Sequence, residues 1–238
     1  AANARAWSPE ALDAAEATYD AAEALYEAAA PTERRSALEA LALTAVAFDA
    51  VEKRSSAEDV KARVDELDYG PLDAGNYALA GDKLATVDSL IASDPTAARD
   101  ASEEALLRYR LVLAKGWELA AGGRRGEAER LKLQAEDIKA QVAVKDDYAA
   151  AKAVWDSAVS AYTAGRHEDS VPLFAEAEAR FQEAYEAAAA KRAAALAAIE
   201  AAKAKSEESA AIAGSGDSVL GIQPKDAPDA DETVEAKE

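Results

Sequence analysis

The 238-residue chain contains no cysteine and no methionine, and it has one histidine, His167. Without cysteine there is no disulfide, no thiolate nucleophile and no thiolate ligand for a metal. A lone histidine without cysteine cannot supply the Cys and His ligands of a typical zinc site, and it cannot form a catalytic Cys–His pair. We therefore predict no catalytic, cofactor-binding or metal-binding residue, expect His167 to be a packing residue, and predict that the protein is not an enzyme.

The chain begins with Ala-Ala-Asn and therefore has no initiator methionine. This start fits either an artificial chain boundary or a mature N-terminus after signal cleavage. We expect export to the periplasm or cell envelope, where a lipobox cysteine upstream of Ala1 would carry a lipid anchor. The chain also lacks any run of 18 apolar residues, so we predict no membrane-spanning segment.

Basic residues are scarce, with 27 Lys and Arg against 46 Asp and Glu, and the net charge is −19. A surface of this sign repels phosphate backbones, which argues against nucleic acid and against anionic membrane as partners. We expect protein partners instead. Self-association stays open at this stage.

Aromatic residues make up only 6% of the chain, although half of it is hydrophobic, because most of that half is alanine. Alanine is the best helix former, and Leu, Glu, Lys and Arg follow it closely. The composition predicts an all-α protein with long Ala-rich helices.

Bulky residues recur at seven-residue spacing, which places each series on one face of a helix. These series are Leu12, Tyr19 and Tyr26; Tyr77, Leu84 and Ile91; and Tyr148, Trp155 and Tyr162.

Helix boundaries are predicted from capping residues, Pro and Gly. The expected N-caps are Ser8, Ser55 or Ser56, and Asp94, each at the start of a helix. Pro31 and the loop from Gly70 to Gly75 are expected to separate helices. The "GGRRG" segment at residues 122–126 is predicted to end one helix, and Gly165 to turn the chain before a very long last helix.

Two nearly identical octapeptides, "AEDVKARV" at 57–64 and "AEDIKAQV" at 135–142, lie 78 residues apart, while the tyrosine series repeat at 71. We interpret these as copies of one helical unit, giving units at about 8–69, 70–142 and 143–213 that stack into an elongated array. If the octapeptides are equivalent, Val60, Val64, Ile138 and Val142 should be buried.

Residues 148–184 resemble a tetratricopeptide repeat, in which large and small residues alternate in a fixed order across two helices. The matching positions are Trp155, Ala158, Tyr162, Gly165, His167, Ser170, Phe174 and Ala177. Tyr162 sits one place late, and Ser170 replaces a small Ala. The segment is also similar to Ala-rich envelope proteins of spirochaetes, some of them lipoproteins, and this resemblance implies a periplasmic interaction scaffold.

Other candidate sites have simpler structural explanations. "GGRRG" lacks the phosphate-loop pattern, although Arg124 and Arg125 could dock on an acidic neighbour. Pairs such as Glu103–Glu104 and Asp146–Asp147 are too numerous to single out as a general acid and base. The tryptophans Trp7, Trp117 and Trp155 are expected in the core rather than in a ligand cavity.

The last segment, 214–238, is acidic and is predicted to be a disordered tail unless Val219, Leu220 and Ile222 dock in a groove. For the chain as a whole we predict a non-enzymatic scaffold for protein–protein interaction. The alternatives are a small-ligand-binding accessory protein of a transport system, or a structural component of an envelope or flagellar assembly. The partner-binding residues are unknown from the sequence.

Overall fold

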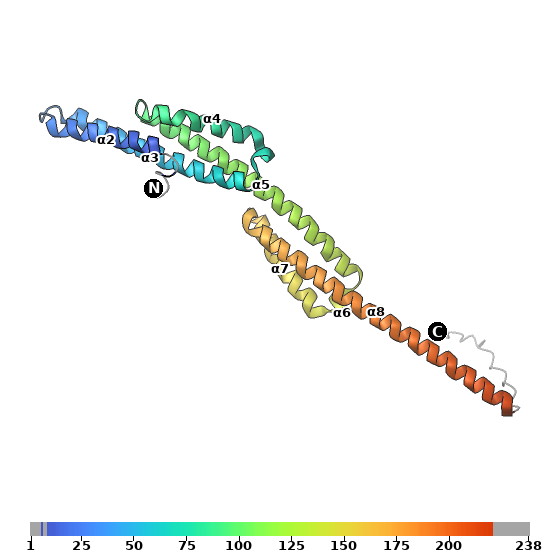
Figure 1. Ribbon diagram of the computed structural model, residues 1–238. Helices are drawn as coiled ribbons and strands as arrows, with labels where there is room; N and C mark the ends of the chain where they lie inside the picture. Colours follow the sequence, from blue (N-terminus) through green and yellow to red (C-terminus); the bar gives the residue numbers. More distant parts are fainter. Residues whose placement is uncertain (1–5, 7–8, 221–238) are drawn as a thin grey trace, which may run out of the picture. The chain divides into compact units, whose positions relative to one another are not determined.

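Every regular element of the described chain, residue 6 and residues 9–220 of the computed structural model, is helical (Figure 1). The predicted all-α class is confirmed. The elements are α2 (Pro9–Ala28), α3 (Arg34–Glu66), η1 (Gly70–Asp73), α4 (Ala74–Leu90), α5 (Pro95–Asp137), α6 (Ala140–Ala143), α7 (Lys145–Thr163) and α8 (His167–Leu220). Trp7, Ser8 and Ile222 lie outside the described residues, as does the rest of the chain after Leu220.

The chain divides into two compact units. The first holds the chain up to Arg130 together with Lys152–Ala179, and the second holds Leu131–Ala151 together with the chain from Arg180. This division passes through the long helices α5, α7 and α8. The three units inferred from the sequence follow the helix pairs instead, and their boundaries stay a prediction.

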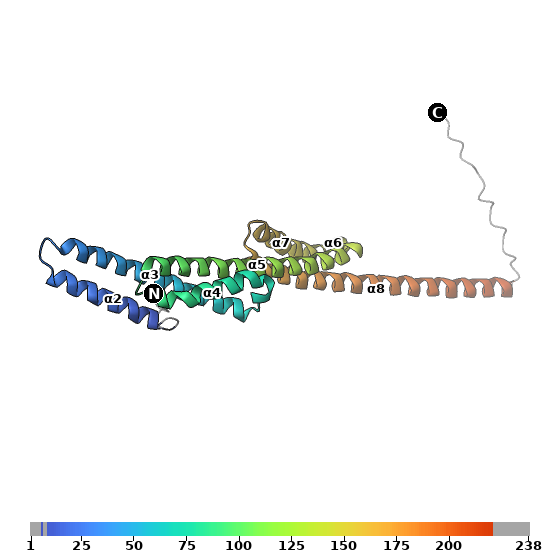
Figure 2. The ribbon, with the colours of Figure 1, turned by 90° about the horizontal axis from the view of Figure 1, so that it is seen from above.

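Alanine supplies much of the first core of the first unit, where α2 and α3 run side by side (Figures 1 and 2). Its buried members are Ala11, Ala15, Ala47, Ala50, Val51, Val87, Ile91, Ala98 and Ala101. Small side chains let helix backbones approach closely. Burial of apolar surface stabilises the fold by about 25 cal/mol per Å², so in this core many small buried side chains contribute what a few large ones would.

A second core of the first unit joins the C-terminal half of α3 to α4 and α5. Tyr109 from α5 is fully buried there, and its ring meets the ring of Tyr77 edge to face at 5.5 Å. Ala57, Ala80, Leu84, Ala105 and Leu106 surround them.

The second unit buries one face of α8 at Phe181, Ala184 and Ala188. The ring of Tyr148 from α7 lies 5.7 Å from that of Phe181. Lys191 then donates to the carbonyl oxygen of Ala143 at 2.8 Å.

Three helices end in a residue with left-handed backbone conformation: Asp68 after α3, Lys139 after α5 and Gly165 after α7. After α3 the amide of Tyr69 donates to Val64 and that of Asp68 to Asp65, and after α7 the amides of Arg166 and Gly165 repeat this pattern with Ala161 and Tyr162. These paired bonds satisfy the last carbonyls of a helix. The predicted turn at Gly165 is confirmed, and so is the Asp94 cap, whose carboxylate accepts from the amide of Ala97 at 3.0 Å.

The predicted helix end at "GGRRG" is wrong, because α5 continues through residues 122–126 to Asp137. The flanking Ala121 and Ala128 are both fully buried, so the helix is held on each side of the glycines. Burial of this face outweighs the helix penalty of about 1 kcal/mol per glycine.

The predicted N-cap at Ser55 or Ser56 is also wrong. α3 runs without interruption from Arg34 to Glu66, and Ser55 is buried within it. Serine is only moderately unfavourable inside a helix, so the neighbouring buried Val51 and Ala57 decide the outcome.

The two octapeptides are not equivalent. The first lies wholly within α3, whereas the second spans the end of α5, where Lys139 breaks the helix. Val60 and Ile138 are both half-buried, but Val64 is fully buried and Val142 is 77% exposed. The 78-residue offset exceeds the 71-residue spacing of the tyrosine series by seven residues, or about two helical turns, so the octapeptides share a pattern but not a position.

The predicted start of the tail at Gly214 is not a helix end, since α8 continues to Leu220. Val219 is 87% exposed and therefore does not dock in a groove of the described chain.

Candidate binding surfaces

A lysine, a carboxylate and a tyrosine form a linked group where α3 ends and α4 begins. Asp65 accepts a hydrogen bond from Tyr77 Oη at 2.6 Å and another from Lys61 Nζ at 2.7 Å. The tyrosine lies twelve residues after the carboxylate, so the group ties the helix before the turn to the helix after it.

The same group recurs where α5 ends and α7 begins. Glu136 accepts from Tyr148 Oη at 2.5 Å and pairs with Lys132 Nζ at 2.8 Å. Each member lies 71 residues after its counterpart, and so does the left-handed Lys139 after Asp68. We call these two groups the tyrosine locks. They recur at the same 71-residue spacing as the tyrosine series of the sequence.

The electrostatics of the first lock favour structure over catalysis. The hydrogen bond to Asp65 raises the pKa of Tyr77. Burial raises the pKa of Asp65, but the bonds from Lys61 and Tyr77 outweigh it and hold that pKa below its ordinary value. A general acid or base works best with a pKa near the ambient pH, and both shifts move away from neutrality.

Each lock borders an open hollow. The first, of about 480 Å³, is lined by Asp65, Asp68, Gly70, Pro71, Ala74 and Tyr77. The second, of about 350 Å³, is lined by Leu133, Glu136, Asp137, Lys139, Gln141 and Tyr148. A base, Lys139, stands where the first hollow has the acid Asp68, so the two hollows differ in charge.

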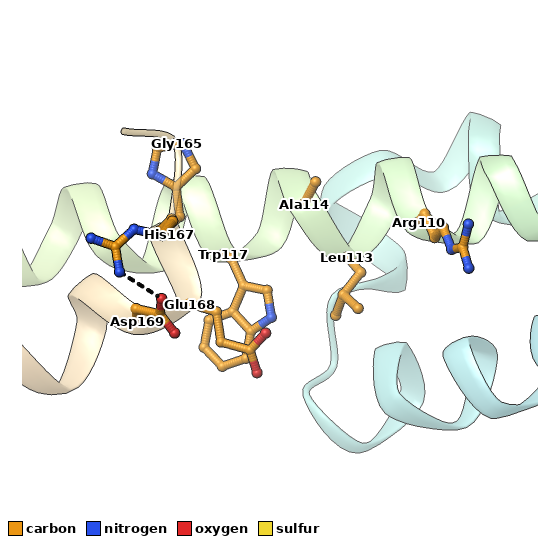
Figure 3. A pocket seen from close by; sticks show the side chains of 9 residues that line it. Arg110, Leu113, Ala114, Trp117, Gly165, His167, Glu168 and Asp169 are labelled. Carbon is orange, nitrogen blue, oxygen red and sulfur yellow. Dashed lines mark hydrogen bonds and ion pairs between the residues drawn. The ribbon is translucent and has the colours of Figure 1, made fainter. Parts of the chain in front are cut away.

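A third hollow, of about 350 Å³, lies in the first unit between α5 and the start of α8 (Figure 3). Leu113, Ala114 and Trp117 come from α5, and His167, Glu168 and Asp169 come from the first turn of α8. This hollow is lined by the one histidine of the chain.

The indole of Trp117 is held in place by two neighbours. Tyr69 meets it edge to face at 5.5 Å, and the guanidinium of Arg63 lies 5.8 Å from its ring. Gly116 permits the approach of Tyr69, because a Cβ at Gly116 would lie 2.0 Å from a carbon of that ring. A mid-helix glycine beside a tryptophan was the only sequence signal of this contact.

Two of the residues that line this hollow each have a buried ring nitrogen, Trp117 Nε1 and His167 Nδ1, that makes no hydrogen bond within the described chain. The ring of His167 packs against that of Tyr162 at 4.8 Å, as expected for a packing residue. Arg166 and Asp169, which also line the hollow, form an exposed ion pair at 3.2 Å.

The other candidate residues predicted from the sequence either make structural contacts or are exposed. Arg124 pairs with Glu178 at 3.3 Å, as proposed, whereas Arg125 lies over the ring of Tyr162.

Glu104 pairs with Lys83 and Arg108, which lower its pKa, and Glu103 is exposed. Asp146 and Asp147 are exposed in the first turn of α7. The ring of Trp155 packs against that of Phe174 at 5.5 Å.

The C-terminal half of α8 is a long uncovered surface of the second unit. Every residue from 191 to 216 is exposed, and apart from α6, which Lys191 reaches at Ala143, no other helix of the unit lies beside this stretch in Figure 1 or Figure 2. Leu196 and Ile199 are 54% and 51% exposed. A long exposed helix with large apolar side chains has the form of a docking surface.

Within the described residues, neither a metal-binding cluster of His, Asp and Glu nor a helix long and apolar enough to cross a bilayer is present.

Comparison with known proteins gives one distant relative. The chain is 23% identical over 170 residues to Treponemal membrane protein A of Treponema phagedenis, covering 71% of this chain and 49% of that protein. The chain thus spans about half the length of the curated relative it matches. No protein-family profile and no solved structure matches it. The expected likeness to a spirochaete envelope protein is confirmed at this level, as similarity to a membrane protein of a spirochaete.

Proposed function

We propose that this chain is a non-enzymatic scaffold that binds other proteins at the cell envelope. The observation that carries the proposal is the stretch 191–216 of α8, whose residues are all exposed although the helix includes Leu196 and Ile199. In proteins most of the stability of a helix comes from tertiary packing of one face, and this stretch has no such packing within the described chain. A partner that covers this stretch would stabilise it.

Stacked hairpins of the tetratricopeptide type are the finer part of the proposal. The two tyrosine locks support a repeat, since each joins a long helix to the next helix through a lysine, a carboxylate and a tyrosine. Stacks of this kind display long surfaces for peptides or helices.

Export and attachment to the envelope are also proposed. The likeness to Treponemal membrane protein A supports them. Protease treatment of intact cells, and of cells with a permeabilised outer membrane, tests the location. Digestion only after permeabilisation is expected, and resistance in both conditions would contradict export.

Site-specific photo-crosslinking tests the scaffold role in cells that naturally make the protein. A photoreactive residue at Ile199 should give a discrete crosslinked product that contains a protein partner. The control is Ala197, which is exposed on the same helix but on a different face, about 160° away at 100° per residue. Equal products at both positions, or none at either, would contradict the proposal.

A second candidate function, small-ligand binding, is favoured by the hollow beside Trp117. Its two unpaired ring nitrogens, one of them an obligate donor, could hydrogen-bond a polar ligand. A thermal-shift screen of amino acids and small organic acids tests this, with His167→Gln as the variant. A ligand that raises the melting temperature of the native chain but not of the variant would support binding, and no shift by any compound would oppose it.

A further inference from the structure

The bases of α8 gather on one face together with its large apolar side chains. Residues 191–205 carry Lys191, Arg192, Lys203 and Lys205 against Glu200, a net charge of +3 in a chain of net −19. At 100° per residue, these four bases, Leu196 and Ile199 all fall within an arc of about 180°. The opposite half of this stretch holds alanines and Glu200.

The complementary surface lies on α2 of the same sequence. α2 carries Glu10, Asp13, Glu16, Asp20, Glu23 and Glu27 and no base. All six are exposed and lie on the side away from the buried Ala11, Ala15 and Ala22. Their spacing of three or four residues places like charges next to one another, which destabilises a helix.

The charge of this acidic face acts on its neighbours. The Glu23 carboxylate raises the pKa of Tyr19, and Asp20 adds to the effect. An opposite charge brought to this face would relieve the repulsion. The two faces also match in length, since the acids of α2 span about 26 Å and the bases of α8 about 21 Å at 1.5 Å per residue.

We propose that the basic face of α8 docks on the acidic face of α2 in a second copy of the chain. The proposal rests on the scaffold function and names the partner as the protein itself. The contact joins two different surfaces, so in a pair one copy keeps its α2 face free and the other keeps its α8 face free. Association therefore extends head to tail, and salt weakens it because the contact is largely electrostatic.

Sedimentation velocity of the full chain tests the proposal directly. At low ionic strength the mean sedimentation coefficient should rise with protein concentration, and about 0.5 M NaCl should weaken the association at least about tenfold. A chain that stays monomeric at all concentrations in low salt would overturn the proposal. The scaffold function would still stand if Ile199 crosslinked to a different protein.

Charge reversal on α8 identifies the surface. The double substitution Arg192→Glu/Lys203→Glu should abolish the association, because it replaces two of the four bases of this face by acids. The matched control changes Ala193, Ala197, Ala201 and Ala204 to Glu, which adds the same negative charge on the alanine face of the same helix. Circular dichroism verifies that both variants remain helical. Equal loss in both variants would overturn the assignment of the face.

A charge swap then identifies the partner surface. Asp20→Lys with Glu27→Lys should also abolish self-association, and mixing this variant with Arg192→Glu/Lys203→Glu should restore it. Failure of the mixture to associate would exclude α2 as the docking surface. Vesicles of phosphatidylglycerol provide the last arm: if the native chain binds them through Arg192 and Lys203 and does not self-associate, the basic face is a lipid-binding surface and the proposal fails.

Discussion

The hydroxyl of Tyr109 is buried between α3, α4 and α5, and it has no hydrogen-bond partner within the described chain. Leaving a buried polar group unpaired costs about 1–3 kcal/mol. We therefore expect Tyr109→Phe to raise the free energy of unfolding by about 1 kcal/mol, measured by urea denaturation. A loss of stability instead would show that the hydroxyl has a partner, such as a buried water.

The same hydroxyl predicts an alkaline limit to stability. Burial raises the pKa of Tyr109 to about 12 from its ordinary value of 10.0. The folded state then holds the proton of this hydroxyl more tightly than the unfolded state does. The protonated hydroxyl therefore contributes to folding stability in full below pH 10, and this contribution is lost as the pH rises toward about 12. Two pKa units correspond to roughly 2–3 kcal/mol.

Denaturation at a series of pH values checks this sign. The native chain should lose stability between about pH 10 and about pH 12, and Tyr109→Phe should lose less over the same range. Identical pH profiles would mean that other groups cause the loss.

The tyrosine locks give a paired prediction. Tyr77→Phe and Tyr148→Phe each remove a donor to a carboxylate, and each should lower the free energy of unfolding by about 1 kcal/mol. Because Asp65 has a lowered pKa, its contribution is present above its ordinary value of 3.8 and is lost as the pH falls through the lower folded value. The cost of Tyr77→Phe should therefore shrink in acid, and a cost independent of pH would contradict the role of the lock.

At the scale of elements, the glycines of α5 fall into two kinds. Gly116 faces the ring of Tyr69, whereas a Cβ at Gly123 would meet nothing within 4 Å. Gly123→Ala should stabilise the protein by about 0.5–1 kcal/mol, because alanine is the better helix former. Gly116→Ala should destabilise it by several kcal/mol, since the new methyl group would overlap the ring. Thermal unfolding of the two variants in parallel checks both signs, and a shared sign would contradict the packing at Tyr69.

Within α8 the two halves should differ in dynamics. The first half buries Phe174, Phe181 and Ala188, whereas residues 191–216 are all exposed. Helix stability in proteins comes mostly from tertiary packing, so hydrogen exchange should be much faster in the second half. Exchange measured by mass spectrometry at low protein concentration gives the monomer value. Slow exchange in residues 191–216 under those conditions would show that something already covers this stretch.

At the scale of the whole molecule, the dominant quantity is the net charge of −19. Excess charge of one sign destabilises a folded chain through self-repulsion, and salt screens it. We expect the melting temperature to rise by a few degrees between about 20 mM and about 500 mM NaCl, measured at a concentration where the protein is monomeric. A fall would mean that surface ion pairs outweigh the repulsion.

The helical class and several helix boundaries follow from the amino-acid sequence, because these depend on local chemistry. Alanine, glutamate and leucine favour a helix in any surroundings, Asp94 caps the helix that Pro95 begins, and Gly165 adopts a left-handed conformation without strain. Each of these effects acts within a few residues. The surplus of acids and the absence of cysteine are likewise properties of the sequence alone.

Tertiary structure decided the points at which local signals conflict with burial. The helix α5 continues through "GGRRG" because Ala121 and Ala128 are buried on either side. The second octapeptide leaves Val142 exposed, because its helix ends in the left-handed Lys139 instead of continuing as α3 does. The carboxylate that meets each lock tyrosine lies twelve residues away across a turn, and only the folded chain identifies which of the 46 acids it is. Packing energies summed over a helix face exceed the propensity of any single residue, so these features depend on the fold.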